Sequence, residues 1–484
     1  MLVYLMAARV SVDADTWWHL RAGQWMIENR QILTKDLFSY TRYEAEWRYP
    51  GWLIEIPMAF IESKLGLGGL NILTGMVIAA TFGFIFATLQ GNELVRAFLI
   101  ILAATVSGMY WSARPHLFTL LFTALFLYLL ESSTRRGLTH SRRSLLIILP
   151  ALMFCWVNSH GGFIVGFIVW GIYFIERLIE QVLLILREGR RIKDVFLDQA
   201  LHTLILIGLG MGILAFLNPL GPQIFLYPFR TVSIQQLRAY IQEWQSPDFH
   251  SLSLQPFIWL LILLLFVSAF SEKNWKIRDF LLVSVFLYLA LIAGRNVALF
   301  ALVAPLPISR MVAESDWSHL FASLNLHGIT TRNHRPPKDY PKLNLFLLSL
   351  IFLGCIFRSY QVYPEEVIVN LLSDGYPLAA VHYLEANRPP GRLFNSYNWG
   401  GYLLWHLPEY PVFVDGRTDL YNEEILDQWF QVAQLKDGWE QVIEQWQIRV
   451  ILMERDWRMA EVYLQHGWCQ SYVDDIAIVL EKCR

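Results

Sequence analysis

The strongest constraint on the fold is a series of apolar segments that carry almost no charged residues. A run of about 20 apolar residues crosses the hydrocarbon core of a bilayer as a helix, and several of these runs are somewhat shorter. With a partial helix at the N-terminus, they predict a polytopic α-helical membrane protein with about 10–12 transmembrane helices. The runs cover residues 68–89, 94–111, 116–130, 145–157, 163–186, 200–217, 256–270, 280–293, 297–312 and 343–357.

The composition agrees with this class of protein. Of the 484 residues, 55% are hydrophobic and only 17% are charged, a combination that is rare in soluble proteins of this size. The formal net charge of −2 gives no reason to expect a nucleic-acid partner. The 19 Trp and 21 Tyr fit both an aromatic belt at the membrane surface and stacking on sugars.

The chain begins with an apolar segment that is too short to span a bilayer. Residues 1–12 lack the basic region and the cleavage site of a signal peptide. We expect either a partial first helix that stops within the bilayer or, preferably, a natural start upstream of Met1.

Three clusters of basic residues predict the orientation, because basic loops stay on the cytoplasmic side of a membrane. Strict alternation between them places the remaining polar segments together on the opposite, extracytoplasmic face. These segments are the first loop, the turn at 114–116, residues 158–160, the loop 218–255, Arg295 and everything after residue 357. The clusters are Arg135, Arg136, Arg142 and Arg143; Arg187, Arg190, Arg191 and Lys193; and Lys273, Lys276 and Arg278.

From residue 359 the chain becomes charged and its apolar residues alternate. Strands that alternate with helices predict a small α/β domain over 359–484, which follows a transmembrane domain over 1–358. We expect strands at 392–395, 412–415 and 450–453, and a closing hairpin over 468–481. Helices are expected at 378–386, 402–407, 423–433, 439–446 and 457–465.

Four cysteines are too few for a disulfide framework. Cys155 and Cys355 lie in apolar runs and are expected to be small core residues. Cys469 and Cys483 share the C-terminal domain and can pair only in an oxidising compartment. A hairpin that turns at Asp474-Asp475 puts them out of register, so the sequence argues against a bridge.

The first loop, residues 13–67, carries the acids with the most chemical potential. Asp13 and Asp15 fall where a first membrane helix would emerge into water, and Asp15 and His19 share one side of a helix that begins at Thr16. Asp36 and Glu55 add carboxylates to the same loop. The alternative for Asp13 or Asp15 is a plain helix cap, a position that Asp favours.

Basic side chains stand at the ends of several runs, all on the predicted outer face. Together they suit an anionic ligand such as a lipid phosphate; the alternative is that each reaches toward the lipid headgroups. For His160, inside the sequence SHGG, a hydrogen-bonded structural role is favoured. The four residues are Arg114, His116, His160 and Arg295.

The C-terminal domain offers weaker signals. VDGRTDLY places Asp415, Arg417 and Asp419 after a predicted strand, where α/β sheets often bind ligands, although a glycine turn with an internal Asp–Arg pair is favoured. Gly400-Gly401 lacks the spacing of a nucleotide-binding loop. The sequence contains no HExxH, GxSxG, Walker or CxxC pattern, which argues against those enzyme classes.

The pattern DADTWWHLRAGQWMIENRQILTKDLFSY, followed by a WLIE segment, resembles the first extracytoplasmic loop of GT-C glycosyltransferases. The bacterial relatives of protein O-mannosyltransferases and aminoarabinose transferases are the most similar. The resemblance is specific in this loop and loose over the rest of the membrane part. The chain departs from the family pattern where Ala14 separates the two acids and where Trp17-Trp18-His19 replaces a tyrosine-rich helix.

The resemblance implies a polyprenyl-phosphate sugar donor, an extracytoplasmic site in a bacterial plasma membrane, and inversion at the anomeric carbon. It maps the catalytic acid onto Asp15 or Asp13. An acceptor hydroxyl must lose a proton, so we expect Asp15 as general base, Asp13 as the second choice and His19 as its orienting partner.

The donor phosphate keeps its negative charge, so we expect Arg295 and Arg114 to bind it, and Asp36, Glu55, His116 and His160 to complete the substrate site. The acceptor can be a glycan, a lipid or a protein. No nucleotide cofactor is expected, and a divalent metal stays open.

Three other functions fit parts of the sequence. A flippase or transporter of lipid-linked saccharides would need polar residues at the middle of the membrane, whereas the charges here fall at the ends of the runs. A glycan polymerase or ligase would use a late large loop, such as 218–255 with Arg230, Arg238 and His250. A non-catalytic membrane scaffold is not excluded.

Overall fold

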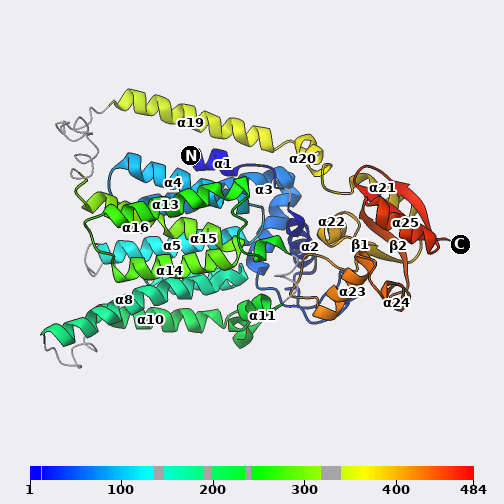
Figure 1. Cartoon of the computed structure of the whole chain (residues 1–484), viewed down its shortest axis with the longest axis horizontal. Coiled ribbons are helices and arrows are strands. Elements are labelled where there is room, and N and C mark those ends of the chain that lie inside the picture. Colours follow the sequence, from blue (N-terminus) through cyan, green and yellow to red (C-terminus); the bar gives the residue numbers. More distant parts are fainter. Residues whose placement is uncertain (12, 136–145, 189–197, 235–240, 318–339, 484) are drawn as a thin grey trace.

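The computed structural model describes all residues except 12, 136–145, 189–197, 235–240, 318–339 and 484. A bundle of helices forms one part of the molecule, and a smaller α/β region lies at one end of it (Figure 1). The predicted class, a polytopic helical membrane protein with a C-terminal α/β region, is confirmed.

The bundle contains helices of very different lengths, joined by short 3₁₀ turns. Its main helices are α1 (Leu2–Ala7), α2 (Ala14–Asn29), α3 (Trp52–Thr88), α4 (Glu93–Ser107), α5 (His116–Arg135), α7 (Ile148–Val157), α8 (Ile164–Glu188), α10 (Gln199–Ala215), α11 (Tyr227–Ser233), α13 (Gln255–Phe270), α14 (Ile277–Ile292), α15 (Val297–Val303), α16 (Pro305–Glu314) and α19 (Pro341–Val362).

Seven helical segments among the described residues are long and apolar enough to cross a membrane: Trp52–Thr88, Glu93–Tyr110, His116–Ser133, Gly161–Glu188, Leu252–Phe270, Gly294–Glu314 and Pro341–Val362. The predicted count of ten to twelve includes shorter helices, among them α7, α10 and α14. The predicted breaks at 114–116 and 294–296 are confirmed, because α5 begins at His116 and a 3₁₀ turn (Gly294–Asn296) precedes α15.

The first loop is shorter than predicted. Helix α3 already begins at Trp52, and Gly66, with a φ of 62°, interrupts it where the predicted loop was expected to end. Glycine adopts this left-handed backbone without a steric penalty, so the chain turns there and continues as a helix.

Part of the basic pattern lies outside the described residues, namely Arg136, Arg142, Arg143, Arg190, Arg191 and Lys193. Arg278 was expected in an exposed basic loop, but it is buried in the bundle. Its guanidinium lies 3.2 Å from Glu131 and 3.5 Å from Glu176, and Asp279 beside it pairs with Arg310. A buried cation needs such partners, so Arg278 joins helices rather than facing a membrane surface.

The C-terminal region contains a four-stranded sheet in the order β1-β2-β4-β3. Strand β1 (Arg392–Asn395) pairs in parallel with β2 (Ile448–Glu454), and β2 and β3 (Trp468–Val473) both pair antiparallel with β4 (Ala477–Lys482). The predicted helices are present as α21 (Leu378–Asn387), α22 (Gly400–His406), α23 (Glu423–Ala433), α24 (Trp439–Gln445) and α25 (Trp457–Gln465), with α20 (Glu365–Leu372) in addition.

The strand predicted at 412–415 is wrong. Val412 makes a single bridge to Ser39 in the first loop, and Phe413 and Val414 are fully buried without joining the sheet. An apolar run can be buried in irregular backbone as well as in a strand when other chain segments supply its hydrogen-bond partners. Here Asn395 supplies them, since its side chain binds the backbone of Phe413 and Val414.

The expectation against a bridge between Cys469 and Cys483 is also wrong, because the two residues form a disulfide with a Cα–Cα separation of 5.2 Å. A bulge between Gln470 and Tyr472 shifts the register of the hairpin, so that Cys469 lies opposite Glu481. Cys483 is then the diagonal neighbour of Cys469 on the same face of the sheet, within reach of a bridge.

The hydrophobic residues form two clusters, and the first loop belongs to the second. One cluster lies within the helical bundle. The other joins Trp17, Trp18 and Trp47 to the apolar residues of the C-terminal region, including Phe413 and Val414. Helix α2 and the first loop therefore lie between the bundle and the sheet (Figure 1), and this position creates the candidate site.

Candidate functional site

Two acids mark the start of α2. The side chain of Asp13 accepts a hydrogen bond of 2.9 Å from the backbone N–H of Asp15, so Asp13 is the N-cap of the helix. Asp15 lies in the first turn and accepts a 3.1 Å bond from the indole of Trp18 on its Oδ1. The capping role that the sequence left open for either acid therefore belongs to Asp13.

Arg114 lies at the centre of three carboxylates. Its guanidinium reaches Asp15 Oδ2 at 2.6 Å, Asp13 Oδ2 at 3.3 Å and Glu243 Oε2 at 3.2 Å. The side chains remain partly accessible, with Asp15 at 27% and Arg114 at 17% exposure. Three segments that are far apart in the sequence thus meet at one cation.

Glu243 was missed by the sequence analysis, although it lies in the loop 218–255 that was predicted on this face. Its other oxygen lies 3.7 Å from Arg295, whose guanidinium stacks on the Trp244 ring at 4.3 Å. A single glutamate in a long loop carries no pattern of its own. The signal that could have found it is the adjacent Trp244, in a loop predicted on the same face as Arg114 and Arg295.

Burial and charge set the protonation of these groups. Burial raises the pKa of Asp15 to about 6; Arg114 opposes the shift, and Asp13 and Glu243 add to it. Burial alone would raise the pKa of Glu243 as well, but Arg295 and Arg114 outweigh it and lower that pKa to about 2. Asp15 is therefore the acid that can exchange a proton near neutral pH.

His19 was expected from the sequence to orient Asp15, but the two side chains do not pair. Its Nδ1 lies 2.8 Å from Glu55 Oε1 on α3, and both side chains are buried. Burial, followed by the charge of Arg114, lowers the pKa of His19 well below its usual range. The residue that contacts Asp15 is instead Trp18, whose ring lies against that of His19 at 3.5 Å.

His116 and His160 lie close to the cluster but are bound to the protein itself. His116 Nε2 donates to the carbonyl of Tyr110 at 2.7 Å, and its ring lies 6.5 Å from that of His160. The Nδ1 atom of His160 accepts from the backbone N–H of Gly162 at 3.0 Å and caps a short 3₁₀ turn. This agrees with the structural role that was favoured for His160.

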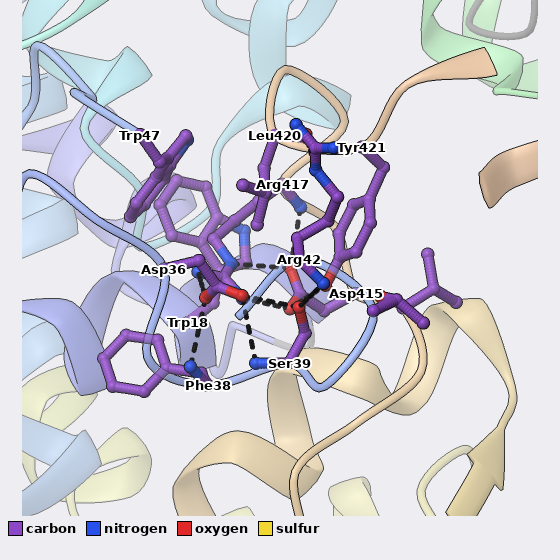
Figure 2. A network of polar contacts seen from close by, with 12 residues as sticks. Trp18, Asp36, Phe38, Ser39, Arg42, Trp47, Asp415, Arg417, Leu420 and Tyr421 are labelled. Carbon is purple, nitrogen blue, oxygen red and sulfur yellow. Dashed lines mark hydrogen bonds and ion pairs between the residues drawn. The ribbon is translucent and has the colours of Figure 1, made fainter. Parts of the chain in front are cut away.

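Asp36 lies in a separate, fully buried network shown in Figure 2. It accepts a 2.7 Å bond from Arg417 of the C-terminal region, which also pairs with Asp415. The Asp–Arg pair expected within VDGRTDLY is confirmed, and it extends to the first loop. The ion-pair partner of Asp36 is thus Arg417 and not Arg114.

Among the described residues, no group of three or more His, Cys, Asp and Glu side chains is arranged to hold a metal ion. The carboxylates of Asp13, Asp15 and Glu243 instead converge on the guanidinium of Arg114, which offsets part of their charge.

No protein-family model matches the sequence, and no curated protein matches it significantly. Two solved structures of the oligosaccharyltransferase from Archaeoglobus fulgidus are similar to the chain at 13% identity. The apo form has a TM-score of 0.52 and covers 92% of this chain and 66% of its own. The form tethered to an acceptor peptide with the NVT sequon has a TM-score of 0.55, with 98% and 70% covered.

A third structure, ArnT from Cupriavidus metallidurans bound to undecaprenyl phosphate, matches at 12% identity over 99% of this chain and 96% of that one, with a TM-score of 0.47. The conclusion on the fold comes from the two oligosaccharyltransferase structures, whose scores exceed 0.5. The chain is thus a polytopic membrane protein whose fold is similar to that of the two oligosaccharyltransferase structures.

Proposed function

We propose that the protein is a membrane glycosyltransferase that moves a sugar from a polyprenyl-phosphate donor to an extracytoplasmic acceptor, which can be a glycan, a lipid or a protein. The observation that carries the proposal is Asp15. This acid is partly exposed, has a pKa raised to about 6, and is fixed by Arg114 and Trp18 where the bundle meets the C-terminal region. The fold of the oligosaccharyltransferase structures supports the reaction class.

In the proposed reaction, Asp15 takes the proton from the acceptor hydroxyl as its oxygen attacks the anomeric carbon. The bond from this carbon to the phosphate oxygen breaks, and the polyprenyl phosphate leaves with the electron pair. Attack from the side opposite the phosphate inverts the configuration. The two arginines of the cluster are the groups that can balance the charge of the base and the charge of the departing phosphate.

The two arginines differ in their availability for the phosphate. Arg114 is already surrounded by three carboxylates, so its charge is used to fix Asp15. Arg295 contacts one carboxylate at 3.7 Å and keeps 29% of its side chain exposed. We therefore assign the donor phosphate to Arg295, and Arg114 becomes the residue that positions the base.

The disulfide supports an extracytoplasmic C-terminal region, because disulfides persist in oxidising compartments and are rare in the cytosol. The site lies against this region, so it shares the same side. Together with the basic clusters of the sequence, this supports a site on the side of the membrane away from the cytoplasm, and the bacterial family that the first loop resembles adds the plasma membrane to the proposal.

The flippase alternative gains no support from the buried charges of the bundle. Glu131, Arg278 and Arg310 are each within four residues of an end of their helix, whereas a transport site would be expected near the middle of the membrane. The polymerase or ligase alternative keeps Glu243 in its favour, since the late loop contributes to the site. Arg238, which was named for it, lies outside the described residues.

The first prediction separates an enzyme from a scaffold. Asn is nearly isosteric with Asp and keeps one acceptor oxygen for Arg114 or Trp18, but it cannot take a proton as a carboxylate does. Asp15→Asn should keep the melting temperature and lower transfer by roughly 10²–10⁴-fold. The matched control is Asp13→Asn, which keeps the N-cap. Parental transfer by Asp15→Asn and by the double variant would remove the catalytic role of both acids.

The second prediction concerns pH. The base must be ionised, so kcat/KM, which reports the free enzyme, should fall as the pH drops through about 6, the raised pKa of Asp15. His19 and His160 do not titrate there, because burial lowers their pKa values well below the usual range. Tyr49 and Tyr397 stay neutral, because burial raises theirs. A profile of kcat/KM that stays flat through pH 6 would contradict the role of Asp15.

The third prediction tests the phosphate site. Arg295→Ala should weaken binding of polyprenyl phosphate by roughly 1.5–3 kcal/mol, the cost of losing a charge-assisted hydrogen bond. Arg295→Lys should restore only part of it, because a lysine cannot make a bidentate contact. Equal affinity of Arg295→Ala and the parent, measured with the lipid in nanodiscs, would leave Arg295 as a headgroup contact.

The fourth prediction tests the orientation. Asn274 lies beside the basic cluster at 273–278, and Ser246 lies in the loop that holds Glu243; both are exposed. In a background without the two free cysteines, a cysteine at Ser246 should react with an impermeant thiol reagent in intact cells. One at Asn274 should react only after lysis. The reverse pattern would place the site in the cytoplasm.

A further inference from the structure

Gly416 touches the carboxylate of Asp15. A Cβ atom built on Gly416 would lie 2.0 Å from Asp15 Oδ1 and 3.3 Å from Trp18 Nε1. No side chain fits at these distances, so the backbone of the VDGRTDLY segment forms a wall directly against the proposed base. Asp15 is thus held on one side by Arg114 of the bundle and on the other by the C-terminal region.

Arg417, the next residue, fixes the position of this wall. Its Nε and Nη2 donate to the two oxygens of Asp415 at 2.9 Å and 2.7 Å, and its Nη1 donates to Asp36 Oδ1 at 2.7 Å (Figure 2). The guanidinium lies 4.9 Å from the Trp47 ring and is completely buried. The bidentate and planar contacts leave it a single orientation.

The first loop offers Arg417 a rigid anchor. Asp36 accepts hydrogen bonds of 3.1 Å from the backbone N–H groups of Phe38 and Ser39, so its carboxylate is held by its own turn. The hydroxyl of Tyr421 donates to Asp415 at 2.8 Å and completes the network. A buried ion pair adds little stability compared with an apolar replacement, so its consequence lies in the geometry that it imposes.

A second contact joins the same two regions. A Cβ on Gly401 would lie 2.6 Å from the carbonyl oxygen of Ala14, and a Cβ on Gly400 would lie 2.2 Å from that of Val414. The paired glycines therefore let α22 approach both the first turn of α2 and the segment that leads to Gly416. The C-terminal region packs directly on the turn that carries Asp15.

We propose that residues 412–421 are a built part of the catalytic centre and that Arg417 is a positioning residue for Asp15. By holding Gly416 against Oδ1, it fixes one orientation of the carboxylate and leaves a single exposed face to the acceptor. The inference rests on the proposed role of Asp15 as the base. It assigns the C-terminal region a place in catalysis that a separate binding domain would not have.

The test compares two glycines of the C-terminal region. Gly416→Ala should push Asp15 aside and lower kcat about 10²-fold, the usual effect of a misplacement near 1 Å, while the affinity for polyprenyl phosphate is kept. The control is Gly375→Ala, because a Cβ at Gly375 meets no atom within 4 Å. Parental transfer by Gly416→Ala would overturn the proposal.

Arg417→Lys separates positioning from stability. It keeps the charge and loses the bidentate contact, so it should lower kcat, leave the KM for the donor unchanged and shift the acid limb of the pH profile. A lower melting temperature with an unchanged kcat and limb would overturn the proposal. Parental transfer by Asp15→Asn would refute the role of Asp15 itself. If Asp15→Asn silences transfer while Gly416→Ala and Arg417→Lys do not, only the present inference fails.

Discussion

The guanidinium of Arg114 allows three carboxylates to lie within one small volume. At an effective dielectric constant of 20, two like charges 4 Å apart repel each other by about 4 kcal/mol. Asp13, Asp15 and Glu243 would therefore separate without a shared cation, and Arg114 contacts all three at 2.6–3.3 Å. Because the acids belong to the start of α2 and to a loop more than two hundred residues later, this one side chain brings the segments of the site together. Changing it alters both the charge of the base and the path of the chain around it.

The site also depends on the seal between the first loop and the C-terminal region. The indoles of Trp17, Trp18 and Trp47 belong to the same hydrophobic cluster as the sheet, so α2 is covered on the side away from the bundle. Aromatic rings bury a large apolar area, and the buried Arg417 network gives this contact one register. These tryptophans of the first loop thus serve an interface within the protein. The domain boundary predicted at residue 358 stays a prediction. The hydrophobic cluster that contains the sheet includes residues from both sides of it.

Much of the architecture follows from the sequence, because apolar runs and strand–helix alternation are local patterns. The breaks at 114–116 and 294–296 and the helices of the C-terminal region are all present. Arg114 and Arg295, which the sequence predicted on one face, both contact Glu243. The misses depend on contacts between distant segments. The spacing of Asp15 and His19 fits one helix face, yet His19 pairs with Glu55 on α3. A bulge in the last hairpin changes its register and brings Cys469 to Cys483, which no count of residues reveals.

The charge balance of the cluster gives the base a link to the donor. Asp13, Asp15 and Glu243 contribute three negative charges and Arg114 and Arg295 two positive ones, so the ionised cluster carries −1 and the cluster with a protonated Asp15 is neutral. On the proposed function, a phosphate at Arg295 adds negative charge beside Glu243. The added charge raises the proton affinity of both acids, but the pKa of Glu243 starts from about 2 and that of Asp15 from about 6, so Asp15 is the one that titrates nearer neutral pH. Asp15 is then a stronger base when the donor is bound than when the site is empty. Glu243, the acid that the two arginines share, keeps the proposed phosphate site and the base within one cluster of charges.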